Sequence, residues 1–201
     1  MKPGKVKQGR DYSLRDEDTR LMVAFGNGSQ RAFERLVRRN QSRIFRLAKR
    51  YLGDHAWAED ITQDVFVRVF NAAENYQPTA KFSTWAYRIT VNLCLNALRD
   101  RKGHGEVALD GGADGNLSEE LEAESVHPSE GMEAEELSEA VSEALSALPE
   151  SQRAVLVLRR YEDLSYDEIA EVTGKPATAV KSLLARARQN LKSLLGKYLR
   201  E

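Results

Sequence analysis

Apolar side chains recur every three to four residues through two long blocks of this chain, and no useful length alternates with period two. A helix buries residues at that spacing, so both blocks are predicted to be helical. Between them the apolar pattern collapses into a segment rich in Gly, Ser and acids, typical of a flexible linker. We therefore expect an all-α fold of two small helical domains, at 16–102 and 132–201, joined by an acidic linker at 103–131 and preceded by a disordered N-terminus at 1–15.

Charge is distributed very unevenly along the sequence. Of the 31 acidic residues, 14 lie between Gly103 and Glu150, and that span contains no Lys or Arg. The remainder of the chain holds all 30 basic residues against 17 acids, although the whole chain has a net charge of only −1. Two basic blocks around an acidic one favour polyanion-binding modules joined by a segment that mimics or avoids polyanions.

Several classes of protein are disfavoured by composition. Cys94 is the only cysteine, which excludes an internal disulfide and a multi-cysteine zinc site. Three scattered His residues make a His-based metal site improbable, so we expect no metal and no cofactor. No apolar run is long enough to cross a bilayer, and the N-terminal residues lack the apolar region of a secretory signal. The chain is expected to stay in the cytoplasm.

The stretch from Ser165 to Leu191 predicts two short helices with a tight turn between them. Ser165 and Glu168 have the spacing of a capping box, Gly174 suits a left-handed helix stop, and Pro176 suits the start of a second helix. The second helix has an apolar face and a basic, polar face, the latter carrying Thr178, Lys181, Ser182, Arg186 and Arg188. This pattern favours a DNA-binding helix-turn-helix, although an ordinary helical hairpin with a solvated basic face has the same pattern.

A second candidate surface lies between residues 75 and 102. Aromatic residues, which can stack on unpaired bases, occur on or beside a polar loop: Tyr76, Phe82, Trp85 and Tyr87. The helix that follows carries amide and basic side chains, which can bond base edges and attract phosphates: Arg88, Asn92, Asn96, Arg99, Arg101 and Lys102. The composition suits a single-strand-binding surface, while Phe82 and Trp85 could belong to the core, the interpretation that is favoured for Trp85 taken alone.

The third predicted helix carries a polar ridge of Glu59, Asp60, Gln63 and Asp64. Asp60 and Asp64 are four residues apart and so share one helix face. Paired carboxylates could bind a divalent cation or act as an acid/base couple. No His, Cys or glycine-rich phosphate loop accompanies them, so a protein-docking ridge or a solvated face is favoured over an enzyme.

Two segments resemble bacterial sigma factors. AEDITQDVFVRVF followed by FSTWAYRITVNLCLNALRDRK resembles their region 2, and LPESQRAVLVLRRYEDLSYDEIAEVTGKPATAVKSLLARARQNL resembles their region 4. The order of the segments, with an acidic linker and no room for a region 3 domain, resembles the extracytoplasmic-function group of the sigma-70 superfamily. Together these motifs are specific, whereas the helix-turn-helix alone is not.

The resemblance implies a role for each candidate surface. Core RNA polymerase would be bound through its β′ clamp helices and β flap, with the clamp helices contacting Asp60, Gln63, Asp64, Phe66 and Arg68. The −10 element would be melted and read by Asn75, Tyr76, Gln77, Lys81, Arg88, Asn92, Asn96 and Arg99. The −35 element would be contacted by Ser165, Tyr166, Thr178, Lys181, Ser182, Arg186 and Arg188. Family members are commonly held by an anti-sigma factor, a further implied partner.

One departure from the family pattern concerns the recognition helix. Leu183 follows the Lys-Ser pair where the family often has Arg, so a guanidinium able to make a bidentate base contact is absent. Its loss would remove about 1–3 kcal/mol of discrimination at one position. Our interpretation is a promoter-specificity subunit that is not an enzyme by itself. The alternative is a stand-alone helix-turn-helix regulator, which leaves the aromatic loop and the acidic ridge unexplained.

Overall fold

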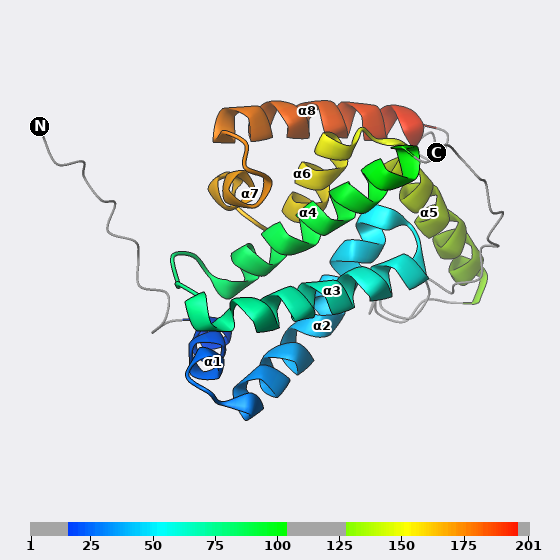
Figure 1. Ribbon diagram of the computed structural model, residues 1–201. Coiled ribbons are helices and arrows are strands. Elements are labelled where there is room, and N and C mark those ends of the chain that lie inside the picture. The colour runs from blue at the N-terminus through cyan, green and yellow to red at the C-terminus, as the bar shows by residue number, and fades with distance from the viewer. Residues whose placement is uncertain (1–15, 104–127, 197–201) are drawn as a thin grey trace, which may run out of the picture.

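The computed structural model describes residues 16–103 and 128–196, and these ranges form eight α-helices and one 3-10 turn (Figure 1). The elements are α1 (Glu17–Gly26), α2 (Gln30–Leu52), α3 (His55–Ala72), η1 (Ala73–Asn75), α4 (Phe82–Gly103), α5 (Pro128–Ala147), α6 (Glu150–Tyr161), α7 (Tyr166–Thr173) and α8 (Ala177–Leu194). The predicted all-α class is confirmed. None of these helices combines the length and the apolar character that a membrane crossing requires. The predicted disorder at 1–15 lies outside the described residues.

Local sequence signals account for the ends of the helices in the first unit, α1–α4. The Asp16 carboxylate accepts a hydrogen bond from the Thr19 amide at the start of α1, and Asp54 does the same for Trp57 at the start of α3. Gly53 ends α2 with φ of 75°, a left-handed conformation that glycine adopts without steric cost. Ser29 occupies the N-cap position of α2, but its side chain makes no capping hydrogen bond.

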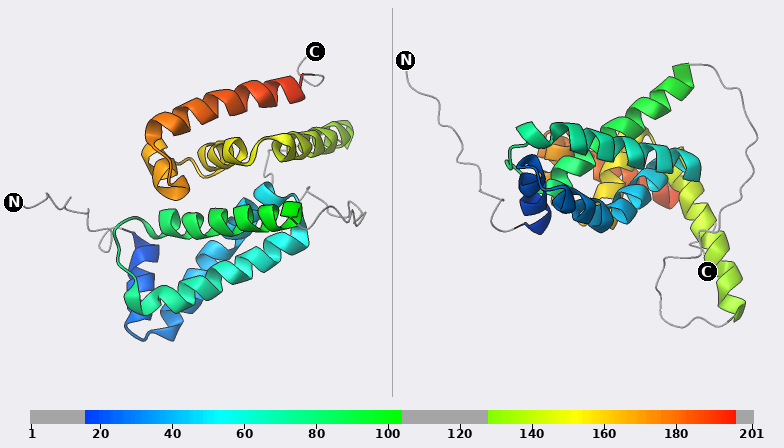
Figure 2. Two further views of the ribbon diagram at one scale, coloured as in Figure 1. Left: turned by 45° about the horizontal axis from the view of Figure 1, so that its top comes forward. Right: turned by 60° about the horizontal axis from the view of Figure 1, so that its bottom comes forward.

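The first unit packs α2, α3 and α4 side by side, with α1 across one end (Figures 1 and 2). The largest fully buried side chains in it belong to Met22, Leu36, Ile44, Leu47, Tyr51, Val65, Val69, Phe82 and Tyr87. At the edge near α1, Phe25, Phe33 and Phe70 bring their ring centroids within 5.4 Å of one another. Phe70, the outer ring of this trio, is 47% exposed.

The second unit consists of α5–α8. Helix α5 begins at Pro128, ahead of Met132, where the apolar pattern predicts that helix resumes. Pro149 is the N-cap residue of α6. Helices α6, α7 and α8 enclose a small core that includes Leu158, Ile169 and Leu184.

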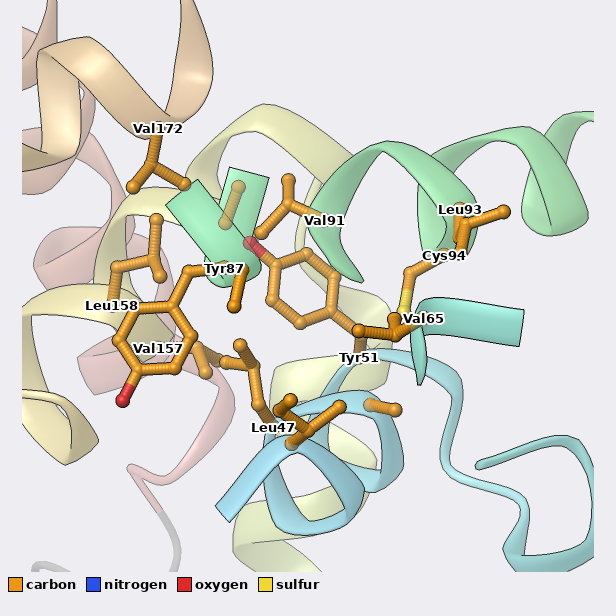
Figure 3. Close-up of a cluster of buried hydrophobic side chains, with 14 of the residues drawn as sticks. Leu47, Tyr51, Val65, Tyr87, Val91, Leu93, Cys94, Val157, Leu158 and Val172 are labelled. Atoms are coloured by element: carbon orange, nitrogen blue, oxygen red, sulfur yellow. The ribbon is translucent and has the colours of Figure 1, made fainter. Parts of the chain in front are cut away.

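The two units lie against each other in one contiguous core. Figure 2 shows α5–α8 as a layer packed over α4 and the end of α2. Figure 3 shows the junction, where Val157 and Leu158 of α6 and Val172 of α7 gather around Tyr87 of α4, beside Tyr51 of α2. Burial of this cluster stabilises the docked arrangement, at roughly 25 cal/mol per Å² of apolar surface removed from water.

A buried guanidinium also ties the two units together. Arg153 of α6 donates one hydrogen bond to the Tyr51 carbonyl in the last turn of α2, at 2.5 Å. It also donates to the carbonyls of Ser146 and Leu148 at the end of α5. The last carbonyls of a helix have no partner within the helix and carry partial negative charge. One side chain therefore supplies hydrogen-bond donors to carbonyl groups at the ends of two helices, which belong to different halves of the chain.

Candidate nucleic-acid interface

A hollow of about 310 Å³ opens where the polar loop meets the start of α4. It is lined by Tyr76, Gln77, Thr79, Ala80, Thr84, Trp85, Arg88 and Glu171. Three residues predicted for −10 contact, Tyr76, Gln77 and Arg88, thus converge on one feature. The aromatic wall and the amide, hydroxyl and guanidinium groups give it the chemistry needed to stack on a base and to bond its edge.

The four aromatic residues near this hollow divide into two pairs. Tyr76 and Trp85 are half-buried, with ring centroids 5.1 Å apart in an edge-to-face arrangement. Phe82 and Tyr87 are fully buried, which confirms the core alternative for Phe82 and excludes Tyr87 as a stacking face. Burial raises the pKa of the Tyr76 hydroxyl. The sequence pattern does not separate these pairs, because all four lie within one short polar and aromatic stretch.

The remaining predicted −10 residues extend from the hollow along α4. Arg88, Asn92, Asn96 and Arg99 are exposed, and their spacing of three or four residues places them on one helix face. Asn96 and Arg99 contact each other, with 3.4 Å between the Asn96 carbonyl oxygen and the guanidinium. Asn75 ends the 3-10 turn before the loop and is exposed. The result is a continuous polar and basic stripe leading into the aromatic hollow.

The helix-turn-helix forms as the sequence predicts. The Ser165 hydroxyl accepts a hydrogen bond from the Glu168 amide, and the Glu168 carboxylate accepts one from the Ser165 amide, which completes the capping box. Gly174 ends α7 at φ of 66°, and Pro176 is the N-cap residue of α8. The hydrogen bonds from Ser165 and Lys81 outweigh partial burial and lower the pKa of the Glu168 carboxyl.

The outer face of α8 is open. All five residues predicted on this face are exposed: Thr178, Lys181, Ser182, Arg186 and Arg188. The opposite face is anchored by the buried Val180, Leu184 and Ala187. Leu183 packs half-buried against the core, so the position where the family often has Arg faces partly inward in this chain.

Tyr166 links the two helices of this motif. Its exposed ring lies between two cations, with the Lys181 ammonium 5.7 Å and the Arg159 guanidinium carbon 5.8 Å from the ring centroid. Lys181 was predicted at this site and Arg159 was not. Arg159 belongs to α6 and is brought here by a turn in which Asp163 adopts a φ of 47°. No sequence spacing signals that approach.

The predicted polymerase-binding ridge lies on the outer side of α3. Asp60, Gln63, Asp64 and Arg68 are exposed there. Phe66 is buried in the core, so its side chain is not available on this ridge. Two apolar side chains that sequence reasoning did not assign to the ridge, Val67 and Phe70, are 57% and 47% exposed on the same helix. The combination of acids with exposed apolar groups suits a protein-docking surface.

Within residues 16–103 and 128–196, no group of three or more His, Cys, Asp or Glu is arranged to hold a metal ion. Cys94 is fully buried, and burial raises the pKa of its thiol to about 12, which keeps it in the unreactive protonated form.

The regions that carry these surfaces match known protein families. Residues 36–104 match Sigma-70 region 2, and residues 138–191 match Sigma-70 region 4. The chain is 36% identical to the ECF RNA polymerase sigma factor SigE of Mycolicibacterium smegmatis, over 92% of this chain and 71% of that protein. It is 34% identical to SigW of Bacillus subtilis, over 84% and 91% of the two chains. The chain belongs to the ECF sigma factors.

Two solved structures share the fold. CnrH, solved in complex with the cytosolic domain of CnrY, superimposes with a TM-score of 0.67 at 26% identity, over 90% of this chain and 99% of CnrH. The sigma factor RpoE of Bartonella quintana, solved with the anti-sigma factor NepR, superimposes with a TM-score of 0.64 at 19% identity, over 84% and 98% of the two chains. The matched regions of this ECF sigma factor contain both candidate DNA surfaces and the α3 ridge.

Proposed function

We propose that this ECF sigma factor binds core RNA polymerase in the cytoplasm and directs promoter-specific initiation, without catalysing a reaction itself. The unit α1–α4 reads and helps to melt the −10 element through the hollow and the α4 stripe. The unit α5–α8 reads the −35 element by placing the exposed face of α8 in the major groove. Phosphate contacts by Lys and Arg supply affinity, and groups reaching base edges supply specificity.

The observation that carries this proposal is the pairing of two different nucleic-acid surfaces in one chain. An aromatic hollow with an amide-bearing stripe suits unpaired bases, whereas a helix-turn-helix with an open basic face suits duplex DNA. A regulator that binds only duplex DNA has no use for the first surface. A factor that opens DNA at one place while holding it at another needs both.

Two protein partners complete the proposal. The α3 ridge of acids with exposed Val67 and Phe70 docks on the β′ clamp helices, and the second unit contacts the β flap. The second partner is an anti-sigma factor, in line with the solved complex of RpoE with the anti-sigma factor NepR. Such a regulator would cover the surfaces that the polymerase needs.

Transcription in vitro tests this function. Core polymerase lacking its own specificity subunit is supplied with a promoter mapped by sequencing transcript starts after overexpression of this chain. We expect initiation only when core and chain are both present, and co-purification of the two. Equal output without the chain would refute the proposal, and duplex binding with no association with core would favour the stand-alone regulator.

Substitutions on α4 localise the activity. Asn92→Ala with Asn96→Ala removes two exposed amides from the stripe while leaving the core intact. We expect initiation on duplex template to fall at least tenfold, and less on a template premelted at the −10 element. Gln41→Ala, an exposed amide truncation on α2, is the control and should leave initiation unchanged. Equal activity of the α4 variant and the control would remove α4 from the site.

A further inference from the structure

At the hollow end, the −10 surface of this chain lies against a helix from its own second unit. Helix α7 lies against α4, as Figure 1 shows. The Glu168 carboxylate of α7 is 3.0 Å from the Lys81 ammonium, although the two residues are 87 positions apart. Glu171, one helical turn further on, lines the hollow together with Arg88. Two carboxylates therefore lie beside cations that a nucleic acid would contact through its phosphates.

The position of α7 is fixed from inside the molecule as well. Glu162, at the end of α6, has a side chain only 3% exposed. Its carboxylate accepts hydrogen bonds from the Tyr87 hydroxyl of α4 at 2.5 Å and from the Arg43 guanidinium of α2 at 2.6 Å. Val172 of α7 packs in the same cluster as Tyr87 (Figure 3). Hydrogen-bonded charge and apolar packing together dock α7 on the first unit.

We propose that α7 is a built-in competitor for DNA, whose acidic face occupies the −10 surface until promoter or polymerase separates the two units. This inference rests on the proposed function and adds a regulatory contact to it. Carboxylate and phosphate are both anions, so Lys81 and Arg88 cannot serve Glu168, Glu171 and a DNA strand at the same place. A strand entering the hollow must displace α7, because like charges brought together repel.

The capping box allows the interface charge of Glu168 to be removed without disturbing the fold. Glu168 has two roles, since it accepts from the Ser165 amide within α7 and pairs with Lys81 across the interface. Gln can accept the first hydrogen bond as Glu does, which is the reason both residues occur at this position of capping boxes. Glu168→Gln thus removes the charge that meets Lys81 and retains the start of the helix. Glu171 is exposed, and Glu171→Gln tests the second carboxylate.

Binding of single-stranded DNA gives the first measurement. Fluorescence anisotropy with the non-template −10 strand of the mapped promoter is compared between the full-length wild type and the Glu168→Gln/Glu171→Gln variant. We expect the variant to bind at least threefold more tightly. Glu139→Gln/Glu143→Gln is the matched control, because it changes the net charge equally at exposed positions of α5. If both double variants gained affinity for the strand equally, the change in net charge alone would explain the effect, and the proposal would be overturned.

A zero-length crosslink gives the second measurement. A carbodiimide activates a carboxylate, and an adjacent amine displaces the resulting urea to form an amide, which suits the Lys81–Glu168 pair. We expect the 81–168 crosslinked peptide in digests of the free chain, and at least a fivefold loss of it when the −10 strand is added at saturation. Unchanged yield with saturating strand would show that α7 and DNA bind together, which contradicts competition. Glu168→Gln should abolish the peptide and serves as the control for its assignment.

A transcription assay distinguishes an error in this inference from an error in the proposed function. If wild-type chain and core polymerase do not initiate, the proposed function is wrong. If they do initiate, the Glu168→Gln/Glu171→Gln variant should reach half-maximal output at a concentration at least threefold lower than the Glu139→Gln/Glu143→Gln control. Coincident titrations of the two variants would leave the sigma-factor function standing and eliminate the competitor role of α7.

Discussion

The two candidate DNA surfaces differ in how accessible they are. The outer face of α8 has Thr178, Lys181, Ser182, Arg186 and Arg188 exposed to solvent. On the −10 surface, Lys81 pairs with Glu168, and the hollow has Glu171 as part of its wall. One surface is open to duplex DNA in the docked chain, while the hollow end of the other lies beside two carboxylates of the chain's own α7.

This difference indicates an order of events. Duplex binding through α8 requires no rearrangement of the core, whereas strand capture by α4 requires α7 to leave. Separation of the units breaks the contacts of Arg153 and Glu162 and exposes the apolar cluster around Tyr87. The free energy for this step has to come from a partner, and a large protein surface such as the polymerase can supply it.

Removal of the bridging guanidinium should have the largest effect. Arg153→Ala leaves the buried carbonyl of Tyr51 without its partner and removes the bonds to the end of α5. We expect a loss of about 2–4 kcal/mol in the free energy of unfolding, since each buried unsatisfied group costs about 1–3 kcal/mol. Urea denaturation followed by circular dichroism measures this. Arg160→Ala, at an exposed position in the same helix, should stay within about 0.5 kcal/mol of wild type.

Truncation on the open surface should affect duplex binding alone. Arg186→Ala is expected to weaken binding of −35 duplex DNA by about 1–3 kcal/mol if the guanidinium reaches a base edge. Electrophoretic mobility shift on matched and mutated −35 sequences checks this at fixed salt. The Glu168→Gln/Glu171→Gln variant should match the Glu139→Gln/Glu143→Gln control in this assay. A selective gain for the α7 variant would show that α7 restrains both surfaces.

Loss of one hydroxyl at the junction should have a smaller effect. Tyr87→Phe keeps the buried ring and removes the hydrogen bond to Glu162. We expect about 1–2 kcal/mol of destabilisation, because the acceptor is a buried carboxylate that retains Arg43. Thermal and urea unfolding measure it, with Tyr166→Phe as the exposed control. Tyr87→Phe should also increase strand binding, since it loosens the docking of α7.

The smallest effect concerns pH. The pKa of Glu168 is lowered in the folded chain, so its contribution to stability is present above its ordinary pKa of 4.5 and disappears as pH falls through the lower, folded-state value. Comparison of wild type and Glu168→Gln across pH 3 to 7 should therefore give a stability difference of under about 1 kcal/mol that vanishes at the acidic end. A difference that is constant with pH would exclude the ionised carboxylate as its source.

Much of the fold could be predicted from the sequence because its signals are local. Capping by Asp16, Asp54 and Ser165 and left-handed stops at Gly53 and Gly174 depend only on neighbouring residues. Apolar spacing likewise separates the inner and outer faces of α8. The burial of Phe66 and the exposure of Phe70 could not be predicted in this way, because both occur on the same helix and only tertiary packing decides which ring is buried.

The contacts between the units could not be predicted from the sequence. Lys81 with Glu168, Tyr87 with Glu162 and Arg153 with Tyr51 join residues 75 to 102 positions apart. No periodicity or motif encodes such pairs. Tyr87 illustrates the difficulty, because its polar and aromatic neighbourhood suggested a nucleic-acid contact, whereas its hydroxyl serves an interface within the chain.

The shared cluster at Tyr87 has a practical consequence for dissecting the molecule. Cutting the chain between α4 and α5 would leave each fragment with a bare apolar patch: Tyr87 and Tyr51 on one, Val157, Leu158 and Val172 on the other. Such fragments should self-associate in dilute buffer and regain solubility when mixed. Assays on an isolated half would then measure the properties of a self-associated fragment. The two halves should therefore be co-expressed and studied together.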